Sequence, residues 1–87
     1  MMHCERFGLE VYITRHARER MVQRNIADAE LSVLLEAGKT RYKDDIRLWI
    51  AKYFPGRMDN LLCLAIVLED RLVVKTVMHH FSWEAEQ

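Results

Sequence analysis

The stretch that decides the fold is Leu61-Leu62-Cys63-Leu64-Ala65-Ile66-Val67-Leu68, an unbroken apolar run. It is far shorter than the roughly 18 residues that a membrane-spanning helix needs. A short apolar run of this kind is typical of a strand that is covered on both faces. Turn-forming residues lie on either side of it, Met58-Asp59-Asn60 before and Glu69-Asp70-Arg71 after. We therefore expect residues 61–68 to form a central strand of a sheet.

Further strands are expected on both sides of this segment. Residues 72–78 follow as the last strand, and strict alternation would place Leu72, Val74, Thr76 and Met78 on one face. Upstream, residues 40–43 predict a short strand, joined by the turn Asp44-Asp45 to a longer strand over 46–54. Nearer the N-terminus, Leu9 to Ile13 alternates apolar and polar side chains, which predicts a half-buried strand.

Two helices are predicted between the first strand and the other four. Thr14 can cap a helix over residues 15–24, and Asn25 can end it in the left-handed conformation. Asp28 can cap a second helix that runs to about Ala37, with Gly38 at its C-terminal end. The order β-α-α-β-β-β-β predicts an α+β fold, with two N-terminal helices packed on a mainly antiparallel sheet of about four to five strands.

Length and charge limit what the chain can do. Its 87 residues are 51% hydrophobic, which predicts one domain over 1–87, with a core at about 9–78 and a C-terminal tail at 79–87. Lys and Arg total 13 and so do Asp and Glu, so nucleic acid would have to bind to a local patch. The N-terminus lacks the apolar stretch of a signal peptide, and we expect a cytoplasmic protein with no membrane contact.

The strongest chemical pattern is a stripe of His16, Arg20 and Arg24, spaced four residues apart on the first predicted helix. A ribonuclease without a metal ion needs groups that exchange protons with the 2′-hydroxyl and the leaving oxygen. It also needs a cation for the charge that develops on the phosphate. Histidine and arginine meet these needs. Alternatively, the histidine lies at the core boundary and the arginines pair with carboxylates of the same domain.

A second histidine candidate lies near the C-terminus, in His79-His80. Adjacent strand residues point to opposite faces, so only one of the two can join His16, and His80 is our candidate for the second proton role. The default alternative is a solvated strand end. The sequence has no His-x-x-x-His or Cys-x-x-Cys spacing, and we expect neither a metal nor a cofactor.

A candidate RNA surface lies in the middle of the chain, where Arg47, Trp49 and Tyr53 alternate on one face of the predicted strand. Such a face can stack bases and bind phosphates, or it can be a core face with Trp49 as its largest member. Beyond the last strand, Phe81-Ser82-Trp83 needs a partner surface. We expect it to fold back onto the sheet, with a homodimer contact as the alternative.

The run Thr14-Arg15-His16-Ala17-Arg18-Glu19-Arg20-Met21-Val22-Gln23-Arg24-Asn25-Ile26 resembles the His-Ala-x-x-Arg-Met-x-x-Arg-Gly-Ile signature of a bacterial family of small domains of unknown function. That family is similar to the RelE and BrnT-type toxins of toxin–antitoxin systems. The resemblance covers about residues 9–78 and implies a RelE-like fold, with His16, Arg20 and Arg24 as motif positions. It also implies RNA and an antitoxin protein as partners. Asn25 stands where the family often has glycine, and Ala27 where it often has a Ser or Thr cap.

Two hypotheses of function follow from the residues and the resemblance together. The first is a toxin-type, metal-independent endoribonuclease or a weakened relative. In it His16 is the general acid or base, Arg20 and Arg24 steady the phosphate, and RNA is held by Arg47, Trp49 and Tyr53. The second is a non-catalytic protein-interaction or structural module, as a monomer or homodimer, whose His–Arg motif packs the first helix onto the sheet.

Overall fold

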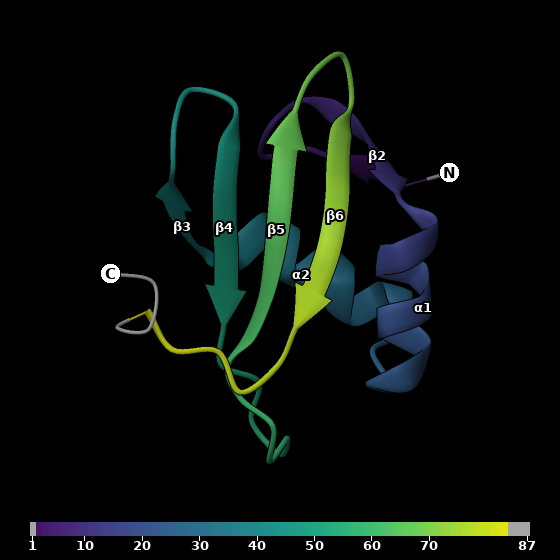
Figure 1. Ribbon diagram of the computed structural model, residues 1–87, viewed down its shortest axis with the longest axis vertical. Helices are drawn as coiled ribbons and strands as arrows, with labels where there is room; N and C mark the ends of the chain where they lie inside the picture. The colour runs from purple at the N-terminus through teal and green to yellow at the C-terminus, as the bar shows by residue number, and fades with distance from the viewer. Residues whose placement is uncertain (1, 84–87) are drawn as a thin grey trace.

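The computed structural model describes residues 2–83, which form two α-helices and six strands (Figure 1). The chain begins with β1 (His3–Cys4) and β2 (Leu9–Ile13), and continues into α1 (Arg15–Gln23) and α2 (Asp28–Ala37). The strands β3 (Lys39–Tyr42), β4 (Arg47–Lys52), β5 (Leu62–Leu68) and β6 (Leu72–Met78) follow. The predicted α+β class is confirmed. The added element is β1, which is too short to leave a periodic pattern in the sequence.

All six strands belong to one curled sheet in the order β1-β2-β6-β5-β4-β3. From β3 to β6 each strand is antiparallel to the next in the chain, and β1 is antiparallel to β2. The exception is β2, which runs parallel to β6 and pairs Ile13 with Val74. The apolar run predicted to be central is β5, which lies between β6 and β4. At its start Leu62, Cys63 and Leu64 are all fully buried, as a strand covered on both faces should be.

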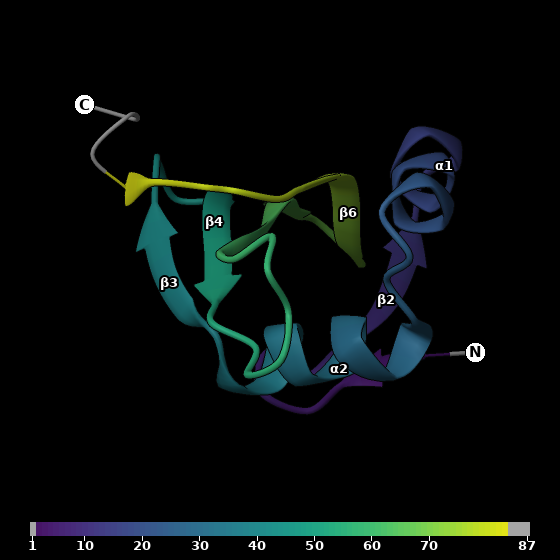
Figure 2. The same cartoon turned by 90° about the horizontal axis from the view of Figure 1, so that it is seen from below.

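The core lies between α2 and one face of the sheet (Figure 2). Leu31, Leu34 and Leu35 of α2 are buried there against inward-facing residues of the strands. Gly38 ends the helix, but its φ of −72° is not left-handed. A Cβ at this position would lie 2.5 Å from Cγ2 of Ile50 and 2.6 Å from the carbonyl oxygen of Leu34. The glycine is therefore required by the close approach of α2 to β4.

Both ends of α1 follow the sequence prediction. The hydroxyl of Thr14 accepts a hydrogen bond from the N–H of Ala17 at 3.1 Å. Asn25 has φ 55°, and the N–H of the next residue, Ile26, donates to the carbonyl of Met21 at 2.8 Å. This is the Schellman arrangement, in which a left-handed residue closes the last helical turn. Asn25 therefore adopts the left-handed conformation that glycine often adopts at the end of a helix.

The start of α2 differs from the prediction. Asp28 is the first helical residue and the capping position is Ala27. Alanine has no side-chain acceptor, and the carboxylate of Glu30 instead accepts the N–H of Ala27 at 2.9 Å. The helix thus keeps only the half of a capping box that its third residue supplies.

One irregularity in the sheet lies between β5 and β6. Ala65 pairs with Thr76, but the next residue, Ile66, pairs with Val74. Lys75 is therefore an extra residue in β6, which makes a β-bulge. Bulges bend a strand and change the direction of its side chains. Here the bulge leaves Lys75 exposed in the middle of an otherwise covered strand.

The bulge overturns the predicted faces of the last strand. Leu72 and Val74 are buried on the same face, but beyond Lys75 the buried residue is Val77. Thr76 and Met78, which strict alternation would place in the core, are only half-buried. The prediction fails because side chains alternate between the two faces of a strand, so one extra residue, Lys75, moves every later side chain of β6 to the opposite face.

Candidate functional site

The face of the sheet opposite α2 is the place where two of the predicted site residues, Arg47 and Trp49, meet. We call it the open face, and it carries Arg47, Trp49, Ala65 and Val67. At one end the segment after β6 crosses it (Figure 2). There the N–H of Phe81 donates to the carbonyl of Leu61 at 3.1 Å.

The crossing segment covers part of the open face. The guanidinium of Arg41, on β3, lies 6.0 Å from the ring of Trp83. Beneath the segment, Ala51 and Cys63 are 3% and 0% exposed, although they alternate with the residues that face α2. The prediction that the aromatic tail folds back onto the sheet is confirmed for Phe81 and Trp83, while residues 84–87 lie outside the described part of the chain.

The uncovered part of the open face contains a hollow of about 220 Å³, which we call the Trp49 hollow. Its floor is apolar and its rim is basic, with Lys43, Arg47, Trp49, Ala65, Val67 and Lys75 among the lining residues. Arg47 and Trp49 therefore share a surface, as the strand pattern predicts. Tyr53 does not join them, because β4 ends at Lys52 and Tyr53 lies beyond it, 61% exposed.

The cations of the Trp49 hollow differ in their partners. Nε of Arg47 donates to the carboxylate of Asp44 at 2.7 Å, and the same carboxylate accepts the backbone N–H groups of Ile46 and Arg47. These hydrogen bonds lower the pKa of Asp44 to about 2, so the carboxylate stays ionised and holds the guanidinium in place. Within residues 2–83, the ammonium groups of Lys43 and Lys75 make no ion pair.

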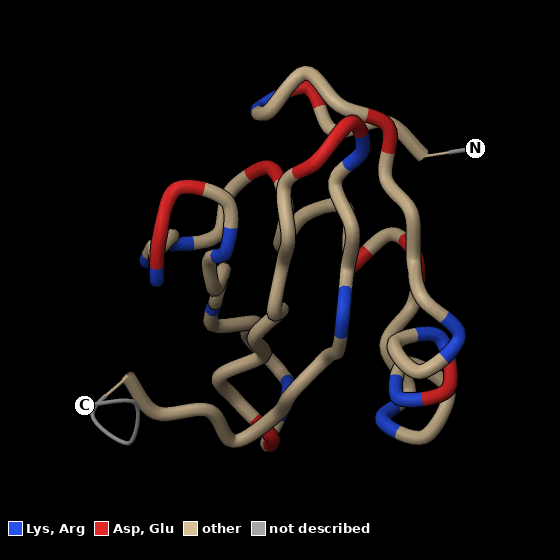
Figure 3. The backbone as a smooth tube through the Cα atoms, turned by 45° about the horizontal axis from the view of Figure 1, so that its top comes forward, with Lys and Arg blue, Asp and Glu red and all other residues tan. Residues whose placement is uncertain are grey.

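The direction of the His16 stripe follows from its neighbour Arg18. Arg18 reaches towards α2, where its Nη1 lies 2.6 Å from the carboxylate of Asp28. Residues two apart on an α-helix differ by about 200°. His16 and Arg20 therefore both lie on the flank of α1 away from α2, which is the side of the open face. Figure 3 shows how densely the basic residues are placed along this helix.

The three residues of the stripe do not share one environment. His16 is exposed, and among the residues described it has no hydrogen-bond partner. Arg20 is half-buried and donates through Nη1 to the side-chain oxygen of Gln23 at 2.9 Å. Arg24 donates through Nη1 to the carbonyl of Val77 at 2.9 Å, and its buried Nε has no partner within the described chain. His16 and Arg20 thus reach solvent, whereas Arg24 fastens α1 to β6.

His80 lies away from His16. It lines an open hollow of about 410 Å³ together with Asn25, Arg57, Met58 and Asp59. Asn25 follows the C-terminal end of α1, and His16 is close to its N-terminal end, a distance of about 12 Å or more along the helix axis. The structure therefore does not bring the two predicted proton-transfer residues together.

Within the described part of the chain, the polar side chain with the most hydrogen bonds is Arg57, which the sequence pattern does not indicate. Arg57, in the loop between β4 and β5, directs Nε and Nη2 at the carboxylate of Asp59, both at 2.9 Å. Nη1 donates to Glu30 at 3.0 Å, and the remaining N–H groups reach the carbonyls of Arg24 and Asn25. All five N–H donors of the guanidinium are thereby used. Apart from Asp59, its partners lie about thirty residues away at the junction of the two helices, and no local pattern encodes them.

Charge in this cluster is held firmly. The hydrogen bonds from Arg57 lower the pKa of Asp59 to about 2 and raise the pKa of the guanidinium above its usual range. His79 lies beside the cluster, with Nδ1 at 3.5 Å from the carboxylate of Asp59. With every donor of Arg57 occupied, the cluster is a structural junction between the loop and the two helices.

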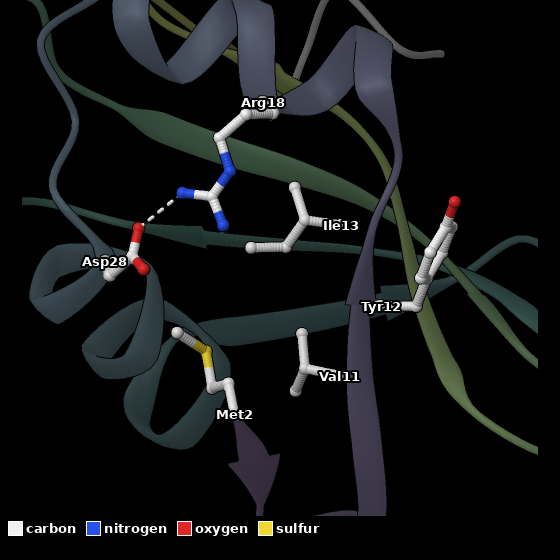
Figure 4. A pocket seen from close by; sticks show the side chains of 6 residues that line it. All are labelled: Met2, Val11, Tyr12, Ile13, Arg18 and Asp28. Atoms are coloured by element: carbon white, nitrogen blue, oxygen red, sulfur yellow. Dashed lines mark hydrogen bonds and ion pairs between the residues drawn. The ribbon is translucent and has the colours of Figure 1, made fainter.

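A third hollow, about 580 Å³, lies between β2, α1 and α2 (Figure 4). Val11 and Ile13 line it, and the ion pair of Arg18 with Asp28 spans one side. Tyr12 points away from the other labelled side chains, and the guanidinium of Arg71 lies 4.6 Å from its ring. Arg18 and Asp28 neutralise each other's charge, and the lining of the hollow is partly polar and partly apolar.

Neither a metal site nor a membrane span is found within residues 2–83. No group of three or more His, Cys, Asp or Glu side chains is placed to hold a metal ion there. Over the same residues, no helix is long and apolar enough to cross a membrane.

Comparison with known protein families gives a match over most of the chain. A protein-family model described as a domain of unknown function (DUF4258) matches residues 13–79. This range begins at the end of β2 and includes the whole His16 stripe, the Trp49 hollow and Arg57. No curated protein and no solved structure matches the chain.

Proposed function

Since this chain belongs to the DUF4258 family of small domains, whose description names no activity, we propose from its site that it is a metal-independent endoribonuclease of the toxin type, or a weakened relative of one. Kinship with the RelE and BrnT-type toxins, and an antitoxin protein as partner, are part of this proposal. The observation that supports it best is that His16 and Arg20 both reach solvent on the flank of α1 that borders the open face.

In the proposed reaction the 2′-hydroxyl of RNA attacks the adjacent phosphate, which gives a cyclic phosphate and frees the 5′-oxygen of the next nucleotide. His16 transfers a proton in this step, either from the attacking hydroxyl or to the leaving oxygen. Arg20 directs its guanidinium at the phosphoryl oxygens and stabilises their developing charge. Arg24 acts as a positioning residue, because its guanidinium is bound to the carbonyl of Val77.

Only one histidine serves this site. His80 lies at the other end of α1, so we assign it no part in proton transfer and give the second proton to water. One positioned acid or base contributes about 10²- to 10⁴-fold to the rate. The proposal therefore describes a slow enzyme. RNA binding is assigned to Arg47 and Trp49 in the Trp49 hollow, with Tyr53 as an exposed contact beyond it.

The test is cleavage of total RNA by purified protein in the presence of EDTA, together with growth after induced expression. We expect His16→Ala to lower the cleavage rate by about 10²-fold or more, and Arg20→Ala to lower it as well. Arg15→Ala is the matched control, since Arg15 lies on the same helix, 93% exposed, and pairs with Glu19 alone among residues 2–83. If the wild-type protein neither cleaves RNA nor arrests growth, or if His16→Ala cleaves normally, the enzyme proposal is wrong.

A second candidate function is a non-catalytic interaction or structural module, as a monomer or homodimer. One observation favours it, namely that Arg24 is used to fasten α1 to β6 through the Val77 carbonyl. In that case the motif serves the packing of the helix. The module would show no cleavage in EDTA. Light scattering would then show whether two copies associate, and variants of His16 would leave that association unchanged.

A further inference from the structure

We propose that the Trp49 hollow binds one unpaired base of a single-stranded RNA, stacked on the Trp49 indole, with the phosphates on either side of that base held by Lys43 and Lys75. This inference rests on the proposed function and adds to it a substrate class, RNA that is not base-paired at the point of contact.

The shape of the hollow fits one planar ring. Its volume of about 220 Å³ is below the ~300–1,000 Å³ of pockets that hold drug-sized ligands. Ala65 and Val67 give it a floor of small apolar side chains, because they lie two residues apart along β5 on the same face. Trp49 is half-buried, so one part of the indole is fixed by packing while the rest faces the hollow. A base can stack there without regard to its sequence identity.

The charges around the hollow fit phosphates. Lys43 follows β3 and Lys75 lies on β6, so the two ammonium groups come from opposite sides of the hollow. Neither has an ion-pair partner in residues 2–83, and both are therefore available to a ligand. Arg47 is oriented by Asp44 and adds a third cation whose position is fixed. A lysine ammonium is a compact charge that can bind a phosphate from many directions, which suits the flexible sugar–phosphate backbone of RNA.

The bulge in β6 gives the hollow its connection to α1. As the extra residue of the strand, Lys75 is exposed and lines the hollow. Its carbonyl accepts a hydrogen bond from the hydroxyl of Thr14 at 3.1 Å, which places the start of α1 beside it. His16 follows two residues later on the flank that borders the open face. A strand of RNA that leaves the hollow past Lys75 thus comes to His16, so the hollow would hold a nucleotide close to the cleaved bond.

A double helix does not fit this arrangement. A paired base is stacked on its neighbours and cannot present its face to Trp49 without being extruded. We therefore expect the hollow to discriminate against duplex RNA of the same length and charge.

The direct test is the fluorescence of Trp49 in a Trp83→Phe protein, in which Trp49 is the only tryptophan. We expect a single-stranded oligouridylate of eight to ten nucleotides, at about 50 mM salt, to quench this fluorescence, and an RNA duplex of equal length to leave it unchanged. Equal quenching by both, or by neither, would overturn the inference.

Variants measured with a dye-labelled oligouridylate give a second readout. Trp49→Ala should weaken binding about 5- to 150-fold and Trp49→Phe, which keeps a ring, much less. Lys43→Gln and Lys75→Gln should each reduce the salt dependence of log K by about one phosphate contact. Lys39→Gln is the control, since Lys39 is exposed on β3 and does not line the hollow.

The outcomes separate this inference from the proposed function. If wild type cleaves RNA and Trp49→Ala binds RNA equally well, the inference that the Trp49 hollow binds a base is refuted, and the nuclease proposal is not affected. Quenching by single-stranded RNA without any cleavage would support the hollow and refute the nuclease. An unfolded Trp49→Ala protein leaves the quenching experiment to decide, because that experiment keeps Trp49.

Discussion

Replacing Arg57 by methionine is the change that should test the structural argument most severely. Methionine keeps an unbranched side chain and removes all five N–H donors. Arg57 and Asp59 are only 18% and 21% exposed, and the lost partners are two carboxylates and two helix-terminal carbonyls. Breaking a buried charge pair costs about 3–5 kcal/mol, and hydrogen bonds to charged groups contribute about 1.5–3 kcal/mol each. Because water can reach the freed carboxylates, we expect a loss of about 2–4 kcal/mol in the free energy of unfolding.

That loss is large for an 87-residue domain, whose total stability is expected to be about 4–13 kcal/mol. Urea denaturation followed by circular dichroism would measure it, and the melting temperature should fall by at least about 8 °C. Asp59→Asn and the double variant Arg57→Met with Asp59→Asn complete a double-mutant cycle, which isolates the interaction energy between Arg57 and Asp59. Arg15→Ala is the surface control. A loss below about 0.5 kcal/mol, no larger than expected for that control, would refute the idea that Arg57 joins the loop to the helices.

The same pair predicts how stability depends on pH. The pKa of Asp59 falls from its usual 3.8 to about 2 in the folded protein, chiefly through hydrogen bonds from Arg57. The unfolded chain therefore binds the proton more readily, so this stabilisation is complete above about pH 4 and disappears as the pH falls towards 2. Allowing for partial exposure, it amounts to about 1–2 kcal/mol. In Arg57→Met this part of the acid dependence should vanish, and an unchanged acid profile would contradict the assignment.

Three further changes should give graded effects on the urea midpoint. Gly38→Ala places a Cβ about 2.5 Å from Ile50 and should cost about 1–3 kcal/mol, so a neutral result would argue against the close approach of α2 to β4. Asn25→Ala forces a residue with a Cβ and no compensating side-chain amide into φ 55° and should cost about 1 kcal/mol, whereas Asn25→Gly should be neutral or stabilising. Arg18→Ala removes an exposed pair with Asp28 and should change stability by less than about 1 kcal/mol, with a smaller effect still at high salt.

The fold could be predicted from the sequence wherever a local pattern decides it. The apolar run at 61–68 predicts the central strand β5, although Ala65 and Val67 are only half-buried because part of the open face is uncovered, and the Thr14 and Asn25 signals set the ends of α1. The bulge escapes such reasoning, because alternation assumes that each residue of one strand faces one residue of the next. The cap of α2 also escapes it, since a carboxylate three residues into the helix replaces the expected side chain.

The candidate site shows the same division between local and distant determinants. Helical spacing alone brings His16 and Arg20 to one flank, but which way that flank faces depends on Arg18 meeting Asp28 of the other helix. Likewise, the hydrogen bond from Arg24 to the carbonyl of Val77 cannot be predicted from the residues near Arg24 in the sequence. The prediction that His80 joins His16 depends on extending the last strand to residue 80, and β6 ends at Met78.

Because of the bulge at Lys75, β6 has one more residue than the stretch of β5 with which it pairs. Were that residue deleted, Thr76 would follow Val74 directly, and Leu72, Val74 and Val77 would fall on one side by simple alternation. The interior would be preserved while one cation and the support for Thr14 would be lost. A chain that lacks Lys75 is thus compatible with the same fold. The extra residue contributes to the surface of the molecule, through its charge and its hydrogen bond with Thr14, and not to the interior.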